Sequence, residues 1–205
     1  MKKQLEQWTG EFGRAYTERN VLDWKLRVPA FREMLKGLAL GRVLEVGCNR
    51  GHNLLTLREV LGSEPEIVGI EPNRQALEIA RASSPQVSVL EGNAYDLPVP
   101  DGSFDLVFTA GVLIHIPADD LPRALAEVYR ASRQYVLAVE YYAEEETPIL
   151  YRGESELLWK RDFRKHYQAQ FPGLRLLRDG YWDAAQGFDR TNWWLLEKPA
   201  GAGKR

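Results

Sequence analysis

Two glutamates and two glycines in the first third of the chain have the types and spacing of a ligand-binding loop. Glu45 stands two residues before Gly47, Gly51 follows four residues later, and Glu71 comes 26 residues after Glu45. A glycine permits backbone turns that are barred to other residues, and it lacks the Cβ that would hold a ligand away from the backbone. A carboxylate can accept hydrogen bonds from both vicinal hydroxyls of a ribose. These residues therefore predict a loop that cradles a nucleoside, with Glu71 on its ribose.

Hydrophobic periodicity predicts the strands and helices that must position these residues. Short apolar runs alternate with helical patterns through the first 140 residues, which predicts a parallel, doubly wound sheet with right-handed crossovers. Ligands of such folds bind outside the carboxyl ends of the strands, where the loop and Glu71 would meet. The expected strands are 43–46, 66–71, 87–91, 104–109 and 134–140, with helices at 54–61, 74–82 and 119–132 and a closing strand pair at 174–178 and 192–197.

The whole chain is expected to form one α/β domain over residues 1–199. Its parts are a helical arm or lid at 1–40, a cofactor-binding core at 41–140, and an acceptor-side segment with the closing strands at 141–199. The sheet is Rossmann-like and seven-stranded, mostly parallel with an antiparallel last strand. A helix at 24–38 is expected to kink at Pro29, a second helix is expected at 154–170, and residues 200–205 are expected to be disordered.

The glycine spacing differs from a dinucleotide fingerprint, which reads Gly-x-Gly-x-x-Gly. The chain reads Glu45-x-Gly47-x-Asn49-x-Gly51, which resembles the first motif of class I S-adenosylmethionine-dependent methyltransferases, usually Asp/Glu-x-Gly-x-Gly-x-Gly. Asn49 stands at the middle glycine, and asparagine tolerates left-handed backbone better than most residues. The second hypothesis is an NAD-dependent oxidoreductase, which shares the sheet and the acidic residue that binds the ribose. The third hypothesis is a non-catalytic S-adenosylmethionine-binding protein.

A second stretch carries the same resemblance. Residues 92–98, Gly-Asn-Ala-Tyr-Asp-Leu-Pro, and residues 103–107, Ser-Phe-Asp-Leu-Val, are similar to a methyltransferase pattern in which Asp usually stands at position 93. The carbonyl of Asn93 can still accept from the adenine 6-amino group. The cofactor-binding residues implied are Tyr16, Glu45, Gly47, Asn49, Gly51, Glu71, Pro72, Asn93, Ala94, Ala110 and Val112.

Candidate catalytic residues follow the fourth and fifth strands. Methyl transfer from a sulfonium is an in-line displacement, in which positioning supplies roughly 7–11 kcal/mol against about 3–5 for a good general base. His115 is the first candidate base, and Glu140 and Tyr142 come next. The alternatives are that His115 only orients its loop and that the other two pack at the strand end.

The acceptor is expected to meet a basic, aromatic wall. Its residues would be Tyr141, Tyr151, Arg152 and Trp159, although charged side chains of this segment could also be the solvated face of the helix expected at 154–170. At the other end of the chain, Phe12, Tyr16 and Arg19 either face the site as a lid or belong to an arm packed on the sheet. Segments 10–20 and 151–163 resemble a bacterial group named pseudaminic acid biosynthesis-associated methylases, which implies a modified sugar or related metabolite as acceptor.

Composition limits the partners, cross-links, metal sites and cellular location that can be expected. A formal charge of −2 gives no general attraction to nucleic acid or anionic membranes, so neither is expected as a partner. The methyltransferase resemblance implies a small-molecule acceptor instead. The single cysteine, Cys48, excludes an internal disulfide, and the three histidines show no metal-ligand spacing. No apolar run has membrane-spanning length and no signal peptide is recognised, which predicts a cytoplasmic protein.

Overall fold

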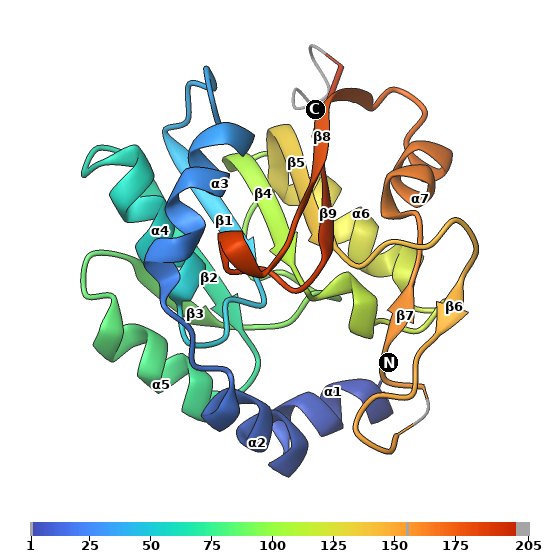
Figure 1. Ribbon diagram of the computed structural model, residues 1–205. Coiled ribbons are helices and arrows are strands. Elements are labelled where there is room, and N and C mark those ends of the chain that lie inside the picture. Colours follow the sequence, from blue (N-terminus) through green and yellow to red (C-terminus); the bar gives the residue numbers. More distant parts are fainter. Residues whose placement is uncertain (1, 155, 200–205) are drawn as a thin grey trace.

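The fold is a seven-stranded sheet with helices on both faces, described by a computed structural model for residues 2–154 and 156–199 (Figure 1). The strand order is β3-β2-β1-β4-β5-β9-β8. The first five strands run parallel, and β9 is antiparallel to both β5 and β8, as expected for this fold class. The expected tail at 200–205 lies outside the described residues. The strands are β1 (Arg42–Val46), β2 (Glu66–Glu71), β3 (Ser88–Glu91), β4 (Phe104–Ala110), β5 (Ser132–Glu140), β8 (Arg175–Trp182) and β9 (Thr191–Glu197).

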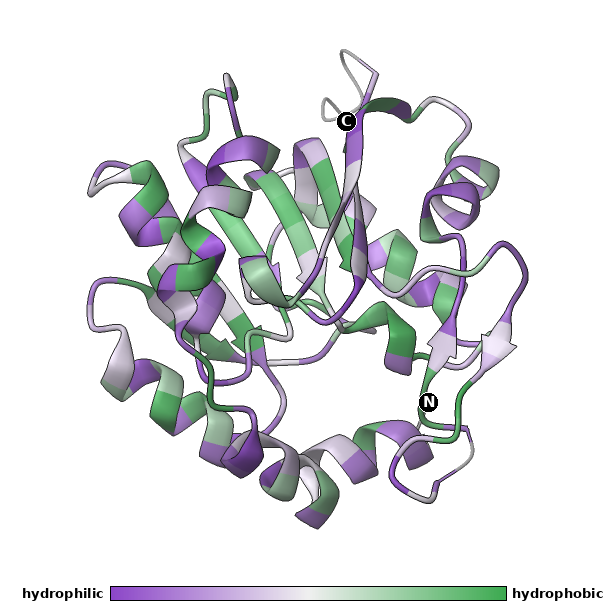
Figure 2. Cartoon of the chain, viewed as in Figure 1, coloured by the Kyte–Doolittle hydropathy of each residue, from purple (hydrophilic) through white to green (hydrophobic). Residues whose placement is uncertain are grey.

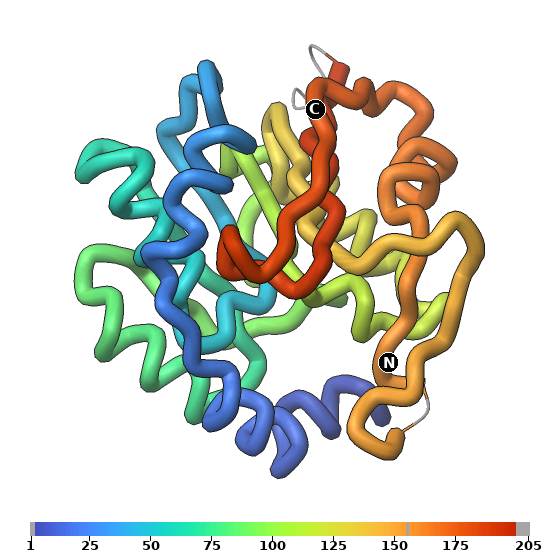
Figure 3. The backbone as a smooth tube through the Cα atoms, viewed as in Figure 1, coloured from blue at the N-terminus to red at the C-terminus, as the bar shows by residue number. Residues whose placement is uncertain are grey.

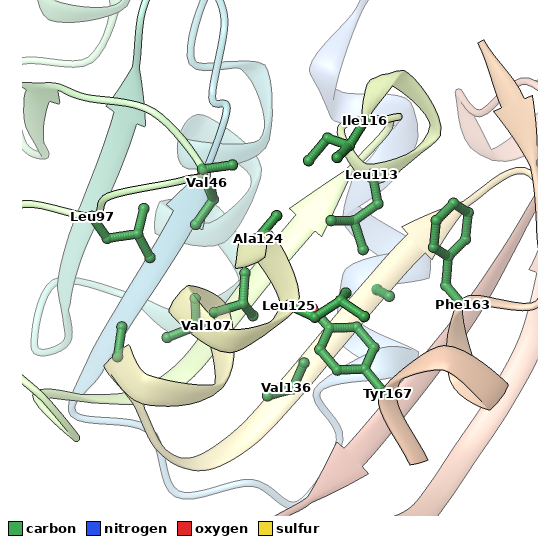
Figure 4. Close-up of a cluster of buried hydrophobic side chains, with 14 of the residues drawn as sticks. Val46, Leu97, Val107, Leu113, Ile116, Ala124, Leu125, Val136, Phe163 and Tyr167 are labelled. Atoms are coloured by element: carbon green, nitrogen blue, oxygen red, sulfur yellow. The ribbon is translucent and has the colours of Figure 1, made fainter. Parts of the chain in front are cut away.

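Each face of the sheet has its own hydrophobic core, which is why the central strands read as nearly continuous apolar runs. One core joins the sheet to α6 (Leu121–Ala131) and α7 (Phe163–Gln170), and Figure 4 shows Val107 and Val136 beside Leu125 of α6 and Tyr167 of α7. The other core lies under α3 (Val28–Met34), α4 (His52–Leu61) and α5 (Arg74–Ser83). In Figure 2 the central strands are green, whereas the helices mix green with purple.

The N-terminal ends of α5 and α3 follow local capping rules. Asn73, expected as an N-cap, accepts hydrogen bonds at its side-chain oxygen from the backbone nitrogens of Gln75 and Ala76, at 3.1 and 3.2 Å. Pro29 is the second residue of α3 and lies in its first turn, so the expected kink within a helix at 24–38 is wrong. A short 3₁₀ segment, η1 (Trp24–Arg27), precedes α3.

The N-terminal helices α1 (Lys2–Thr9) and α2 (Glu11–Arg19) lie across from the carboxyl ends of the parallel strands (Figures 1 and 3). The Asn73 side chain donates to the Trp8 carbonyl at 2.9 Å, and the Asn49 side chain donates to the Thr17 hydroxyl at 3.1 Å. Both asparagines belong to loops that follow strands, so these bonds join the two helices to the edge of the sheet where a ligand would bind.

The helix expected at 154–170 begins only at Phe163, so that prediction is wrong for residues 156–162. Trp159 and Lys160 form β7, which pairs antiparallel with β6 (Thr147–Pro148). Arg161 is fully buried, donates to the Ile116 carbonyl at 2.7 Å and pairs with Glu146 at 2.6 Å. These long-range bonds hold the segment in an extended path, and the helix starts where Asp162 caps it by accepting from the Lys165 nitrogen.

Candidate functional site

A cavity of about 400 Å³ lies at the carboxyl ends of β1, β2, β4 and β5, between the sheet and the N-terminal helices. This volume is in the usual range for small-molecule sites. Of the eighteen residues proposed for catalysis, cofactor binding or acceptor binding, fourteen line it: Tyr16, Glu45, Gly47, Asn49, Glu71, Pro72, Asn93, Ala94, Ala110, Val112, His115, Tyr141, Tyr151 and Arg152. The other four, Gly51, Glu140, Tyr142 and Trp159, are not lining residues.

The glycine loop turns through left-handed backbone at three places. Gly47, Asn49 and Gly51 have φ angles of 77°, 45° and 79°. A Cβ at Gly47 would also lie 2.6 Å from a methyl carbon of Val112, so the loop comes very close to the β4 side of the cavity. Asn49 adopts the left-handed conformation that the usual glycine would adopt, and its side chain is turned to Thr17 of α2.

Glu71 is buried at the end of β2 and is held by two backbone donors. Its Oε2 accepts from the Asn49 nitrogen at 2.8 Å, and its Oε1 accepts from the Asn73 nitrogen at 2.9 Å. Burial raises the pKa of this carboxyl to about 7 in spite of those two bonds. Each carboxylate oxygen retains a lone pair for a further donor, such as a ribose hydroxyl.

Glu45 at the end of β1 faces a cation that the sequence analysis missed. Its Oε1 accepts from the Asn53 side chain at 2.7 Å, and its Oε2 has no hydrogen-bond partner among the described residues. Burial raises the pKa of this carboxyl to about 8. Arg27, also a lining residue, donates to Asn53 at 2.7 Å and to the Gly187 carbonyl at 2.9 Å. An acid beside a cation can bind the two ends of an amino acid.

His115 ends the 3₁₀ turn η2 (Leu113–His115) after β4, and its ring is fixed by one hydrogen bond. Its Nδ1 lies 2.6 Å from the Leu157 carbonyl, which can only accept, so Nδ1 carries the hydrogen and Nε2 is left as an acceptor. Burial lowers the pKa of this imidazole to about 4. The ring therefore stays neutral at pH 7, and it packs against Trp8 and Tyr151 at centroid distances of 4.5 and 5.6 Å.

The two other catalytic candidates lie away from the cavity. Glu140 is fully buried and accepts from the backbone nitrogens of Val112, Leu113 and Ile114 at 3.2, 3.2 and 3.3 Å. Its carboxylate therefore organises the turn that carries His115 and does not face an acceptor. Tyr142 is 42% exposed and its ring is directed to Trp194 on β9, not into the cavity.

Gly51 and Trp159 also occupy supporting positions. Gly51 is the residue before α4, where a Cβ would lie 3.4 Å from that of Ala80, so it allows α4 and α5 to approach closely. Trp159 is buried on β7 with the Arg161 guanidinium 5.1 Å from its ring. Both residues shape elements around the cavity without lining it.

Within residues 2–154 and 156–199, no group of three or more His, Cys, Asp or Glu side chains is placed to hold a metal ion. In the same part of the chain, no helix is both long and apolar enough to cross a membrane.

Comparisons with known proteins were made for sequence and for structure. Residues 43–134 match a family described as "Methyltransferase domain". Demethylmenaquinone methyltransferase of Listeria welshimeri is 30% identical over 119 residues, which are 54% of this chain and 50% of that protein. The corresponding Staphylococcus aureus protein is 33% identical over 110 residues, 52% of this chain and 44% of its own length. The chain thus spans about half the length of the curated relatives it matches.

The solved structures that resemble this chain have the same fold. Magnesium protoporphyrin IX methyltransferase from Synechocystis, solved with bound S-adenosylhomocysteine, has a TM-score of 0.72 at 12% identity and covers 97% of this chain and 100% of its own. A SAM-dependent methyltransferase from Aquifex aeolicus has a TM-score of 0.64 at 17% identity and covers 97% and 99%. At these identities the likeness identifies the Rossmann-like architecture.

Proposed function

We propose, from the match of residues 43–134 to a family of methyltransferase domains, that the protein transfers a methyl group from S-adenosylmethionine to a small-molecule acceptor. The observation that carries the proposal is that the Gly47 loop, Glu71 and Asn93 line one cavity at the carboxyl ends of the strands. The relatives named demethylmenaquinone and magnesium protoporphyrin IX methyltransferase support a small-molecule acceptor.

The proposed cofactor site divides among three parts of the cavity. Glu71 accepts from the ribose hydroxyls, and the loop at Gly47 gives the backbone approach that the nucleoside needs. Asn93 receives the adenine amino group at its side-chain oxygen, which already accepts from the Tyr95 nitrogen at 2.9 Å and so offers its second lone pair. Glu45 and Arg27 take the ammonium and carboxylate groups of the methionine end.

The proposed chemistry is an in-line displacement assisted by His115. The cofactor supplies a methyl group already activated on a sulfonium, so the protein mainly aligns the acceptor and excludes water. His115 holds its bare Nε2 as a neutral base because its Nδ1 hydrogen is committed to Leu157. It takes the proton that the acceptor loses, and Glu140 keeps the turn under it in place.

Within small molecules, we propose a modified sugar or related metabolite as the acceptor. The support is the resemblance of segments 10–20 and 151–163 to the pseudaminic acid biosynthesis-associated group. Both segments contribute to the cavity wall, through Tyr16, Arg19, Asn20, Tyr151, Arg152 and Leu158.

The test is calorimetric titration of the full chain with S-adenosylmethionine and S-adenosylhomocysteine, with NAD as the comparison ligand. We expect micromolar binding of the first two and none of NAD. If the chain binds neither S-adenosylmethionine nor S-adenosylhomocysteine, the proposal is refuted. Tight binding of NAD would favour an oxidoreductase. Incubation of cell extract with methyl-labelled cofactor then separates an enzyme from a non-catalytic binder, because only an enzyme transfers label to a metabolite.

A further inference from the structure

Two arginines lie on the side of the cavity formed by the N-terminal helices and the 149–153 loop, here called the lid side. Arg19 of α2 and Arg152 of the 149–153 loop both line the cavity and are exposed. Neither forms an ion pair or a hydrogen bond with any residue in the described part of the chain. The third lining arginine, Arg27, is different because its guanidinium already donates to Asn53 and Gly187.

Both arginines are nevertheless held in place, by aromatic rings. The Arg19 guanidinium carbon lies 5.4 Å from the Tyr16 ring centre and 5.8 Å from that of Phe12. The Arg152 guanidinium carbon lies 5.9 Å from the Tyr151 ring centre, and the Phe12 and Tyr151 rings are 6.2 Å apart. A guanidinium that uses its face against a ring keeps its N–H edge free for hydrogen bonds. The two cations thus stand at the ends of one continuous aromatic wall with their donors available.

Among the described residues, the carboxylates around the cavity form no ion pair with Arg19 or Arg152. Glu45 and Glu71 lie at the strand ends, on the sheet side, and Asp189 accepts from the Tyr141 hydroxyl at 2.8 Å. On the lid side, Glu18 of α2 accepts from Gln75 at 3.4 Å, and Glu156 pairs with Lys3 at 3.8 Å. On the sheet side the cation Arg27 therefore lies beside Glu45, whereas the two guanidinium groups of the lid side are paired with no carboxylate of the described residues.

We infer that the acceptor is an anion, a small molecule whose carboxylate or phosphate group binds Arg19 or Arg152, at one end of the aromatic wall on the lid side of the cavity. This inference rests on the proposed function. The body of the acceptor lies along the aromatic wall, with its reacting atom toward His115, whose ring is 5.6 Å from that of Tyr151. Arginine N–H edges match carboxylate and phosphate oxygens in pairs, and a cationic entrance also steers anions toward the site.

Two matched pairs of probes test the charge preference on the full chain saturated with S-adenosylhomocysteine. 4-Hydroxybenzoate is compared with 4-hydroxybenzamide for the carboxylate arm, and phenyl phosphate with phenol for the phosphate arm, by calorimetry. At least one anion is expected to bind about tenfold or more tightly than its neutral mate, as charged hydrogen bonds would give. The arm with the larger ratio identifies the anion. Equal affinities within both pairs, or no binding by any probe, overturn the inference.

Two double variants with the same net charge test whether the anion preference comes from Arg19 and Arg152. R19Q/R152Q should reduce the anion preference at least about fivefold. R14Q/R32Q should leave it unchanged, because Arg14 and Arg32 are exposed and do not line the cavity. A preference that survives in R19Q/R152Q, whose folding is checked by thermal melting, overturns the inference. Failure of the wild-type chain to bind S-adenosylhomocysteine would instead refute the proposed function, and the anion preference is then measured on the chain without it.

Discussion

Replacing Glu71 by glutamine tests the ribose role with almost no change of shape. The carboxylate accepts from two backbone nitrogens, those of Asn49 and Asn73, at 2.8 and 2.9 Å. A glutamine amide has only one oxygen, so its NH₂ group must meet one of these two N–H donors, whichever way the amide is turned. The variant therefore loses one backbone bond and the acceptor for one ribose hydroxyl.

The expected loss follows from the value of hydrogen bonds to a charged group. Such a bond contributes about 1.5–3 kcal/mol, so Glu71→Gln should weaken S-adenosylhomocysteine binding by roughly 10- to 150-fold. The unfolding free energy of the free protein should change less, because glutamine also removes the cost of burying a carboxylate whose pKa burial has raised to about 7.

Calorimetry with two probes isolates the ribose contact from general damage. Adenosine and 2′,3′-dideoxyadenosine are titrated into wild type and Glu71→Gln, which forms a thermodynamic cycle. Wild type should prefer adenosine, and the variant should lose most of that preference. If the preference is the same in both proteins, Glu71 does not bind the ribose and the reasoning fails.

The pH dependence of binding gives a second readout. Because burial raises the pKa of Glu71 from 4.5 to about 7, the folded protein binds more protons than the unfolded chain between these values, so this group makes stability fall as pH rises through that window. Ribose hydroxyls donate to the ionised form, so cofactor affinity should instead increase from pH 6 to 8. The part of this increase centred near pH 7 should be absent in Glu71→Gln.

Three further predictions concern the loop, the base and the turn. Gly47→Ala should abolish S-adenosylhomocysteine binding, as judged by calorimetry, because its Cβ would contact Val112 at 2.6 Å; Gly37→Ala is the control, since Gly37 has a similar φ of 76° with open space around it and should bind normally. His115→Gln should lower the methyl-transfer rate by about 10²–10⁴ while cofactor affinity is kept, and at saturating cofactor the wild-type rate should stay flat down to about pH 5 because burial lowers the pKa of His115 to about 4. Glu140→Leu should reduce the unfolding free energy in urea by about 1–3 kcal/mol, because three backbone donors lose their buried acceptor even though the cost of burying a carboxylate is removed; unchanged stability would contradict the assigned contacts.

Some features could be predicted from the sequence because they depend on neighbours along the chain. The alternation of apolar runs predicted the parallel strands, and the Gly47–Gly51 spacing predicted a loop after β1. Asn73 was recognisable as an N-cap because capping involves only the next three residues. The carboxyl ends of parallel strands share one edge, so Glu71 could also be assigned to the site from its place in the sequence.

Other features depend on contacts between distant segments, for which a single sequence carries no local signal. Arg27 meets Asn53 and Gly187 only because η1 packs beside the glycine loop, and Arg161 stays out of a helix because its side chain is bound to Ile116 and Glu146. The direction of the Glu140 carboxylate was likewise decided by packing, which turned it to three backbone nitrogens. Local patterning fixed the order of elements and the loop that faces a ligand, whereas tertiary packing chose which charged side chains share the cavity, because burial and hydrogen bonding across the chain outweigh local preference.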